Sequence, residues 1–212
     1  MYTKFFKRFL DLLLSVSALI VAFLPLAIIA LILVIDSPGP VFFKQKRVGK
    51  NKVHFNIYKL RSMPVKTPSD VPTHLLQNPD EFLSKFQKFI RKTSIDELPQ
   101  LINIIRGDMS IVGPRPALWN QFDLIELRDQ YGVNDIRPGL TGLAQIRGRD
   151  ELELDVKAAY DGEYASNISF LQDVKCIIFT ALSVLRSDGV VEGGTGAMEK
   201  ENEKEKETAI NK

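Results

Sequence analysis

The feature that most constrains this chain is an uncharged apolar run near its N-terminus. The run extends over 24 residues, from Leu12 to Ile35. As a straight helix it would be about 36 Å long, which is enough to cross the hydrocarbon layer of a bilayer. A cleaved secretory signal normally has a shorter apolar region that ends in small residues, whereas this run ends in IDSPGP. The sequence therefore predicts a retained membrane helix.

A proline and the flanking charges indicate how this helix enters the membrane. Pro25 lies in the middle of the run, where a proline deletes a backbone hydrogen bond and kinks a helix. Basic residues mark the cytoplasmic side of a membrane segment, and here they lie on both flanks. We therefore favour a re-entrant hairpin over residues 1–36, although prolines also occur in straight transmembrane helices. The flanking basic residues are Lys4, Lys7 and Arg8 before the run, and Lys44, Lys46, Arg47, Lys50 and Lys52 after it.

The rest of the chain has the composition of a globular domain followed by a polar tail. Hydrophobic residues make up 45% of the chain and charged residues 25%, which excludes global disorder. The single cysteine, Cys176, excludes an internal disulfide, and His54 and His74 lack the spacing of zinc ligands. We expect a cytosolic, membrane-associated domain at residues 37–190 and a disordered polar tail at residues 191–212.

Local patterns predict a mostly helical α+β fold for the domain. The runs VFFKQ and VHFNIYKLRSM are rich in β-branched and aromatic residues and are separated by VGKNK, which predicts a short β-hairpin. Four prolines between Pro64 and Pro79 predict a loop. Helical runs are expected near residues 119–131 and 169–185, the second apolar enough to pack in a core or against the membrane.

A basic amphipathic helix is predicted before the central motif of the chain. Its apolar residues follow helical spacing, with lysines and an arginine on the other faces. Such a helix can lie on an anionic membrane surface or pack its apolar face on the domain core, and the pattern leaves both open. The apolar residues are Phe82, Leu83, Phe86, Phe89 and Ile90.

Two adjacent carboxylates, Asp96 and Glu97, lie at the N-terminal end of the helix predicted in TSIDELPQLINIIRGD. That helix starts either with a capping box of Ser94 and Glu97 or with Asp96 as the cap, which places Pro99 in the first turn. At a helix N-terminus, free N–H groups and the helix dipole keep a carboxylate ionised and attract phosphate. An ionised carboxylate facing a phosphate is what acyl-phosphate chemistry needs.

This chemistry requires positive charge, because two carboxylates repel an anionic substrate. A Mg²⁺ ion held by Asp96, Glu97 and substrate phosphates would supply part of it. Arginine matches phosphate geometry in two-point contacts and would supply more. Turns at Pro114 and Pro138 can bring backbone N–H groups close to an anion, although singly such turns are more often only turns. The basic candidates are Lys59, Arg61, Arg91, Arg115, Arg137, Arg147 and Arg149.

With these residues in place, the chain resembles the monotopic phosphoglycosyl transferases of the bacterial sugar transferase family. The resemblance covers about residues 5–189 and rests on an ordered set of motifs, far more specific than any one of them. It implies a proline-broken helix inserted in one leaflet, with interfacial helices around a small catalytic domain, in the minimal form of the family. Many relatives have Ser where Leu24 precedes Pro25 here. The motifs are KRFLDLLLS, SPGPVFFKQKRVG, FNIYKLRSM, IRKTSIDELPQLINIIRGDMSIVGPRPAL and IRPGLTGLAQIRGR.

The resemblance also implies an activity on the cytoplasmic face of the bacterial cytoplasmic membrane. Asp96 would attack the sugar-bearing phosphate of a UDP-sugar, release UMP and pass the phosphosugar to undecaprenyl phosphate, while Glu97 orients Asp96 or helps hold Mg²⁺. The product would start capsule, exopolysaccharide or glycan assembly, and the segment GRDELELDVKAAYDGEYASN suggests an N-acetylated or deoxy amino sugar. Arg91 and Arg115 match basic positions of the family's cleft; Lys59, Arg61, Arg137 and Arg147 follow as further substrate-binding residues.

A second class of function remains open. A non-catalytic membrane-associated module that binds a nucleotide or polyprenyl phosphate would not need an intact pair of Asp96 and Glu97. Nucleic-acid binding is not expected, because the basic residues are dispersed and no known binding fold is recognisable. The expected partners are a UDP-sugar, undecaprenyl phosphate and membrane lipids, and a homodimer is compatible with the sequence.

Overall fold

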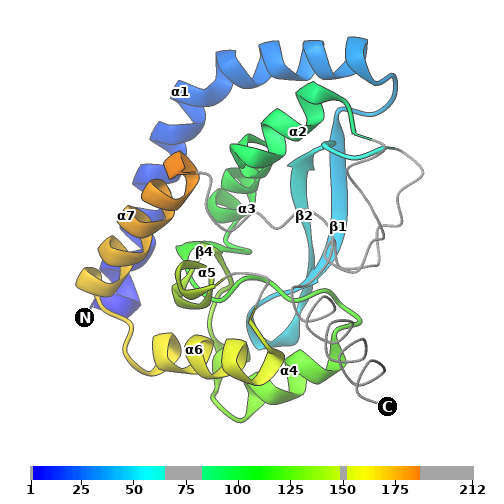
Figure 1. The fold of residues 1–212 in the computed structure, drawn as a ribbon. Coiled ribbons are helices and arrows are strands. Elements are labelled where there is room, and N and C mark those ends of the chain that lie inside the picture. The colour runs from blue at the N-terminus through cyan, green and yellow to red at the C-terminus, as the bar shows by residue number, and fades with distance from the viewer. Residues whose placement is uncertain (1, 65–82, 149–151, 187–212) are drawn as a thin grey trace, which may run out of the picture.

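The computed structural model describes residues 2–64, 83–148 and 152–186 (Figure 1). It confirms a mostly helical α+β fold. A π-helical turn, Tyr2–Phe6, runs into the long helix α1, Lys7–Asp36. The other elements are β1 Phe42–Val48, β2 His54–Leu60, α2 Lys85–Lys92, α3 Gln100–Arg106, β3 Ser110–Val112, α4 Phe122–Asp129, β4 Gly139–Thr141, α5 Leu143–Arg147, α6 Leu154–Ser166 and α7 Phe170–Arg186, with short 3-10 turns at Lys50–Lys52, Ile95–Glu97 and Val133–Asp135.

Helix α1 continues through Pro25, and Figure 1 shows it bent near its middle. The proline accounts for the bend, because it cannot donate to the carbonyl one turn earlier and its ring clashes with that carbonyl. By length and composition α1 could cross a membrane: its most apolar stretch has a mean hydropathy of 3.2 and is only 6% buried. Val21 and Ile35, for example, expose 78% and 74% of their surface.

Only one side of α1 packs on the domain. Leu19 contacts the core cluster around Ile57 and Ile104, and Leu33 is fully buried against Leu60 and Ile90. Leu26 and Ile29 pack partly against the same cluster as Leu33, whereas most of the other large apolar side chains of α1 are exposed. Helix α1 is therefore docked on the domain along one stripe and exposed along the others.

Polar side chains near the start of α1 fix this docking. Arg8 Nη1 donates to the carbonyl of Ile104 at 2.7 Å, and its Nη2 donates to that of Ile105 at 3.1 Å. The buried carboxylate of Asp11 accepts from Ser110 Oγ at 2.7 Å and from the N–H of Ile111 at 3.0 Å. Because these partners lie at the end of α3 and in β3, the start of α1 is held against the centre of the domain.

Strands β1 and β2 form the predicted hairpin, paired antiparallel from Phe42 opposite Leu60 to Val48 opposite His54. Ile57 and Leu60 are both buried, and because they are three residues apart they lie on opposite faces of β2 and pack in two different core clusters. The tight connection places Asn51 in the left-handed region with φ of 54°, a conformation that asparagine tolerates.

The sequence did not predict the second sheet, a short parallel pair of β3 and β4 with Ser110 opposite Gly139. It brings the two glycine- and proline-rich motifs together. A Cβ at Gly139 would lie 2.1 Å from the backbone nitrogen of Gly113, so only glycine permits this approach. The N–H of Gly139 donates to the carbonyl of Pro114 at 2.8 Å. The structure thus uses this N–H group for packing two segments together.

The remaining predicted helices agree with the structure in part. Helix α2 buries Ile90 and leaves Phe89 53% exposed, so its apolar residues serve both the core and the surface. Neither predicted cap of the next helix forms: Ser94 and Asp96 make no capping bond, and Pro99 occupies the N-cap of α3. Helix α7 confirms the run predicted at residues 169–185. Most of the proline-rich stretch and the tail lie outside the described residues.

Candidate active site

The two carboxylates lie in the 3-10 turn Ile95–Glu97, between α2 and α3. Ser94 takes the left-handed conformation with φ of 55°, which turns the chain sharply after α2. Helix α3 then begins directly after Pro99, where a proline costs no hydrogen bond. Asp96 and Glu97 are therefore held at the entrance of α3, as the sequence predicted.

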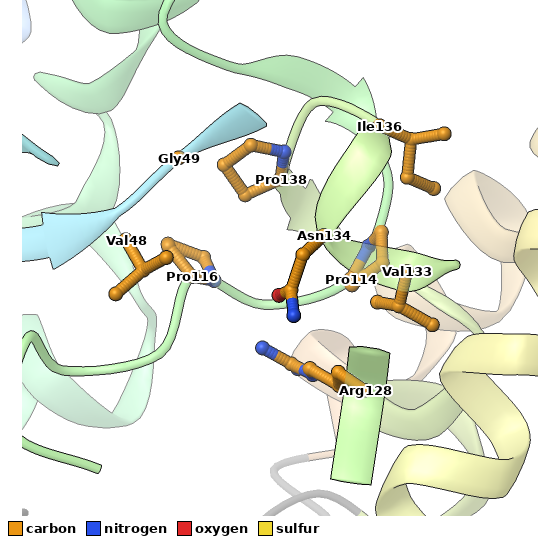
Figure 2. Close-up of a pocket in the computed structure, with 9 residues that line it drawn as sticks. All are labelled: Val48, Gly49, Pro114, Pro116, Arg128, Val133, Asn134, Ile136 and Pro138. Atoms are coloured by element: carbon orange, nitrogen blue, oxygen red, sulfur yellow. The ribbon is translucent and has the colours of Figure 1, made fainter. Parts of the chain in front are cut away.

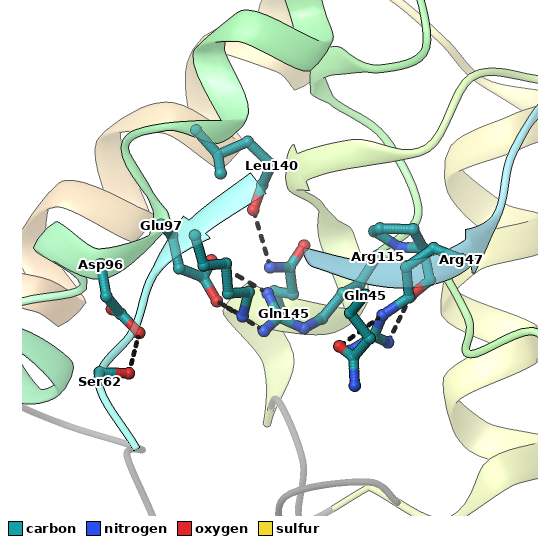
Figure 3. Close-up of polar contacts among 10 residues, drawn as sticks. Gln45, Arg47, Ser62, Asp96, Glu97, Arg115, Leu140 and Gln145 are labelled. Carbon is teal, nitrogen blue, oxygen red and sulfur yellow. Dashed lines mark hydrogen bonds and ion pairs between the residues drawn. The ribbon is translucent and has the colours of Figure 1, made fainter. Parts of the chain in front are cut away.

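Asp96 is buried, with 7% of its surface exposed. Its Oδ2 atom accepts a hydrogen bond from Ser62 Oγ at 2.8 Å (Figure 3). Burial raises the pKa of Asp96 above its ordinary value, and the charges of Lys59 and Arg91 oppose this without outweighing it. Ser62 was missed by the sequence analysis, although it lies in the motif FNIYKLRSM beside two of the predicted basic residues.

Glu97 is clamped by two cations, as Figure 3 shows for Arg115. Lys59 Nζ donates to Oε1 at 2.8 Å. Arg115 donates through Nη2 to Oε1 at 2.8 Å and through Nη1 to Oε2 at 3.3 Å. Burial works against the charged form, but Arg115 and Lys59 outweigh it and hold the pKa of Glu97 well below its usual range. Glu97 is thus ionised at neutral pH, and its position depends on β2 and on the loop after β3.

Arg91 supplies a further positive charge near Asp96. It lies in the last turn of α2 and is close enough for its charge to lower the pKa of Asp96. Its buried Nε atom has no hydrogen-bond partner among the described residues. A buried donor without an acceptor is costly, so this geometry suits an incoming anion such as phosphate.

The contacts described for the remaining predicted basic residues are with groups other than the two carboxylates. Arg61 follows β2, yet its guanidinium donates to the carbonyls of Ser37 and Pro38 and so fixes the turn after α1. Arg137 is exposed, and its Nε donates to the carbonyl of Gly107 at 2.9 Å, at the opposite end of α3 from the site. Both contacts satisfy backbone groups of the fold, and substrate binding by these two residues stays a prediction.

Arg147 is exposed at the end of α5, with its guanidinium 5.6 Å from the centre of the Tyr160 ring. This cation–π contact links α5 to α6. Arg149 lies outside the described residues. Of the predicted basic residues, the structure therefore gathers Lys59, Arg91 and Arg115 around the carboxylates.

Comparison with known proteins identifies the family. Residues 2–187 match the family described as bacterial sugar transferase. The chain belongs to the bacterial sugar transferase family. It is 43% identical over 153 residues to an uncharacterized sugar transferase, EpsL, of Bacillus subtilis, with 72% of this chain and 73% of that protein covered.

Two further relatives carry names that state an activity. The chain is 35% identical over 202 residues to the undecaprenyl-phosphate galactose phosphotransferase of Salmonella typhimurium, which covers 88% of this chain and 42% of that protein. It is 38% identical over 192 residues to the UDP-N-acetylgalactosamine-undecaprenyl-phosphate N-acetylgalactosaminephosphotransferase of Aeromonas hydrophila, with coverages of 87% and 45%. This bacterial sugar transferase thus spans less than half the length of these two relatives.

The carboxylates of this sugar transferase fit a Mg²⁺ ion that binds together with substrate. No group of three or more His, Cys, Asp or Glu side chains in the described ranges is placed to hold a metal alone. Mg²⁺ usually takes one or two carboxylates and completes its shell with phosphates and water. The oxygens of Glu97 already face Lys59 and Arg115, and Ser62 binds Oδ2 of Asp96. Asp96 is therefore the primary candidate ligand.

Proposed function

We propose that this protein transfers a sugar-1-phosphate from a UDP-sugar to undecaprenyl phosphate and releases UMP. The observation that carries the proposal is the pairing of a buried carboxylate, Asp96, with an arginine whose buried donor has no acceptor, Arg91. This arrangement suits a nucleophile beside a phosphate site. The family and the names of the Salmonella and Aeromonas relatives support the same reaction.

In the first step, an Asp96 carboxylate oxygen attacks the phosphorus atom that carries the sugar. The bond from this phosphorus to the bridging oxygen breaks, and UMP leaves with the electron pair. The sugar phosphate is then bound to Asp96 as a mixed anhydride. Arg91 would stabilise negative charge on the transferred phosphoryl group. The clamped Glu97 keeps a fixed negative charge beside Asp96, consistent with its help in orienting Asp96 or a cation.

In the second step, a phosphate oxygen of undecaprenyl phosphate attacks the same phosphorus atom. The bond to Asp96 breaks, the carboxylate is restored, and the sugar leaves as a polyprenyl diphosphate sugar. Mg²⁺, when bound, would neutralise phosphate charge at the site. The same phosphorus atom is attacked twice, first by Asp96 and then by undecaprenyl phosphate. Asp96 must therefore act as a nucleophile in the first step and as a leaving group in the second.

We further propose that α1 enters one leaflet of the cytoplasmic membrane and returns, leaving the domain on the cytoplasmic face. The bend of α1 near its middle, the presence of Pro25 inside this helix, its one-sided docking and the basic residues at both ends support this topology. Cysteines introduced by Thr3→Cys and Ser37→Cys should both react with a membrane-impermeant thiol reagent in inside-out vesicles and stay protected in right-side-out vesicles. Opposite protection of the two sites would establish a straight span.

The donor is proposed to be an N-acetylated or deoxy amino sugar, and the product to initiate capsule, exopolysaccharide or glycan assembly. The Aeromonas relative is named for an N-acetylated amino sugar and the Salmonella relative for galactose. A panel of UDP-sugars therefore has to contain both classes. Preference for a neutral hexose over every amino sugar would correct the donor while leaving the reaction unchanged.

UMP release tests the reaction directly. Purified protein with Mg²⁺ and undecaprenyl phosphate should release UMP from one donor of the panel, and EDTA should stop the release. Asp96→Asn should abolish it, whereas Asp155→Asn, a change of an exposed carboxylate on α6, should not. Intact-protein mass spectrometry without carrier should show the mass of one phosphosugar on the native chain only. Ligand binding without UMP release from any donor would instead establish a non-catalytic binding module.

A further inference from the structure

The loop after β3 carries Arg115, and hydrogen bonds from other segments hold its backbone carbonyl groups. This GPRP loop, Gly113–Pro116, presents three consecutive carbonyl groups, and each accepts from a different donor. The carbonyl of Pro114 accepts from the N–H of Gly139 at 2.8 Å, and that of Pro116 from Arg47 Nη1 at 2.9 Å. The carbonyl of Arg115 itself accepts from Arg128 Nη2 at 3.0 Å. The backbone of the residue that clamps Glu97 is thus fixed from behind.

Arg128 reaches this carbonyl from a buried ion pair. It lies on α4 and is 3% exposed, and its partner Asp161 lies on α6 and is 1% exposed. Arg128 donates to Asp161 Oδ2 through Nε at 3.0 Å and through Nη2 at 2.5 Å. Nη2 therefore serves the carboxylate and the Arg115 carbonyl together, which a single-point cation cannot do with the same geometry.

We infer that the Arg128–Asp161 pair is a positioning device for Arg115, and through Arg115 for Glu97. The inference rests on the proposed function, because Glu97 matters only if the site beside Asp96 is the catalytic one. The chain of contacts runs from Asp161 to Arg128, to the carbonyl of Arg115, and from the Arg115 guanidinium to Glu97. No member of the pair contacts Glu97 in this chain, so both act through Arg115.

Two features of the surroundings help the Arg128–Asp161 pair to position Arg115. Prolines on both sides of Arg115 restrict the backbone, since proline fixes its own φ and limits the residue before it. Figure 2 shows the Arg128 side chain at a small pocket behind the loop, lined by Pro114, Pro116 and Asn134 among others. Removal of the guanidinium would enlarge this space, and the loop could then shift with little resistance from behind.

Stability alone does not account for such a pair. Replacing a buried ion pair by apolar residues of similar volume is often neutral or stabilising, because the charges no longer have to be desolvated. The double variant Arg128→Met with Asp161→Leu should therefore keep the fold while removing the donor to Arg115. An exposed pair provides the control: Lys52, in the turn between β1 and β2, lies with its Nζ atom 2.5 Å from Oδ2 of Asp129 on α4, and Lys52→Met removes this pair.

The test measures UMP release and thermal unfolding of the full chain. We expect the double variant to unfold at or above the native temperature, and its kcat to fall about 10- to 100-fold at a nearly unchanged KM for the UDP-sugar, since misplacement by about 1 Å has effects of that size. Lys52→Met should leave kcat unchanged. A folded double variant with native kcat would overturn the inference. If the double variant does not fold, Arg128→Lys keeps the charge but not the fork, and the same kcat criterion applies.

A coupling measurement separates this inference from the reaction itself. Glu97→Gln removes the far end of the contact chain, so its effect on the unfolding temperature should be smaller in the double variant than in the native chain. Its effect in the Lys52→Met background should be unchanged. If the native protein releases no UMP from any donor, the proposed function fails, and this coupling alone decides: additive effects on the unfolding temperature overturn the positioning role.

Discussion

The clamp on Glu97 makes a quantitative prediction about stability. Glu97→Gln keeps the size of the side chain but leaves Lys59 and Arg115 without their shared counter-charge. A hydrogen bond to a charged group contributes about 1.5–3 kcal/mol. The side chains of Lys59 and Arg115 are 16% and 29% exposed, so solvent screens part of this. We therefore expect a loss of about 2 kcal/mol, the lower part of that range, which lowers Tm by about 4–8 °C for a chain of this size.

The lowered pKa of Glu97 determines in which direction the stabilisation by this clamp changes with pH. The pKa of Glu97 is held well below its ordinary value, so the clamp stabilises the folded state at pH values above the ordinary carboxylate range. That stabilisation disappears as the pH falls through the folded-state pKa. The Tm difference between the native chain and Glu97→Gln should thus be full at pH 7 and shrink steadily as the solution becomes strongly acidic.

The fluorescence of the single tryptophan, Trp119, can follow unfolding in detergent micelles. Asp129→Asn serves as the control, because Asp129 also binds a lysine and has a lowered pKa but lies exposed on α4. Its Tm should stay within about 2 °C of the native value, as expected for a surface pair. A Glu97→Gln variant with the native Tm at pH 7, or a difference that grows with acidity, would refute the argument.

Three further predictions address the site and its support. Ser62→Ala should move the acid limb of the pH profile of kcat/KM to higher pH, because the lost hydrogen bond had lowered the pKa of Asp96; an unmoved limb would contradict this. Gly139→Ala should prevent recovery of folded protein, since its Cβ would lie 2.1 Å from a backbone nitrogen of the GPRP loop; native yield and Tm would disprove the close contact. Arg91→Met should lower kcat/KM about 100- to 1000-fold with little change in Tm, whereas Arg137→Met should lower Tm and spare kcat/KM. The reverse order would assign substrate binding to Arg137.

Local sequence patterns predicted the parts of the fold that depend on interactions between residues close in the sequence. The hairpin follows from alternation and turn residues, and the helices from apolar spacing. The position of Asp96 and Glu97 before α3 follows from Pro99, which suits the first residues of a helix. The exact cap did not follow, because Ser94 adopts a left-handed conformation that no local preference of serine indicates.

Contacts between distant segments escaped prediction. The parallel pairing of β3 with β4 joins two short strands, each of three residues, too short for periodicity to show. The hydrogen bond from Ser62 to Asp96 and the pair of Arg128 with Asp161 depend on tertiary placement. Arginine is also ambiguous, since its guanidinium can donate to phosphate and to backbone carbonyls alike. The sequence offered both Arg61 and Arg91 as substrate-binding candidates, with Arg91 matching a basic position of the family's cleft, and only the structure shows that Arg61 fixes a turn.

Helix α1 and the turn that carries Asp96 and Glu97 share one element of support. Arg8 of α1 donates to carbonyls near the C-terminal end of α3, and Asp96 lies just before the N-terminal end of the same helix. Helix α3 thus connects the start of α1 with the turn that carries the two carboxylates. The proposed reaction joins a water-soluble nucleotide sugar to a phosphate fixed at a membrane surface. With Asp96 as the proposed nucleophile, its connection to α1 through α3 would meet that geometric requirement without any large movement of the domain.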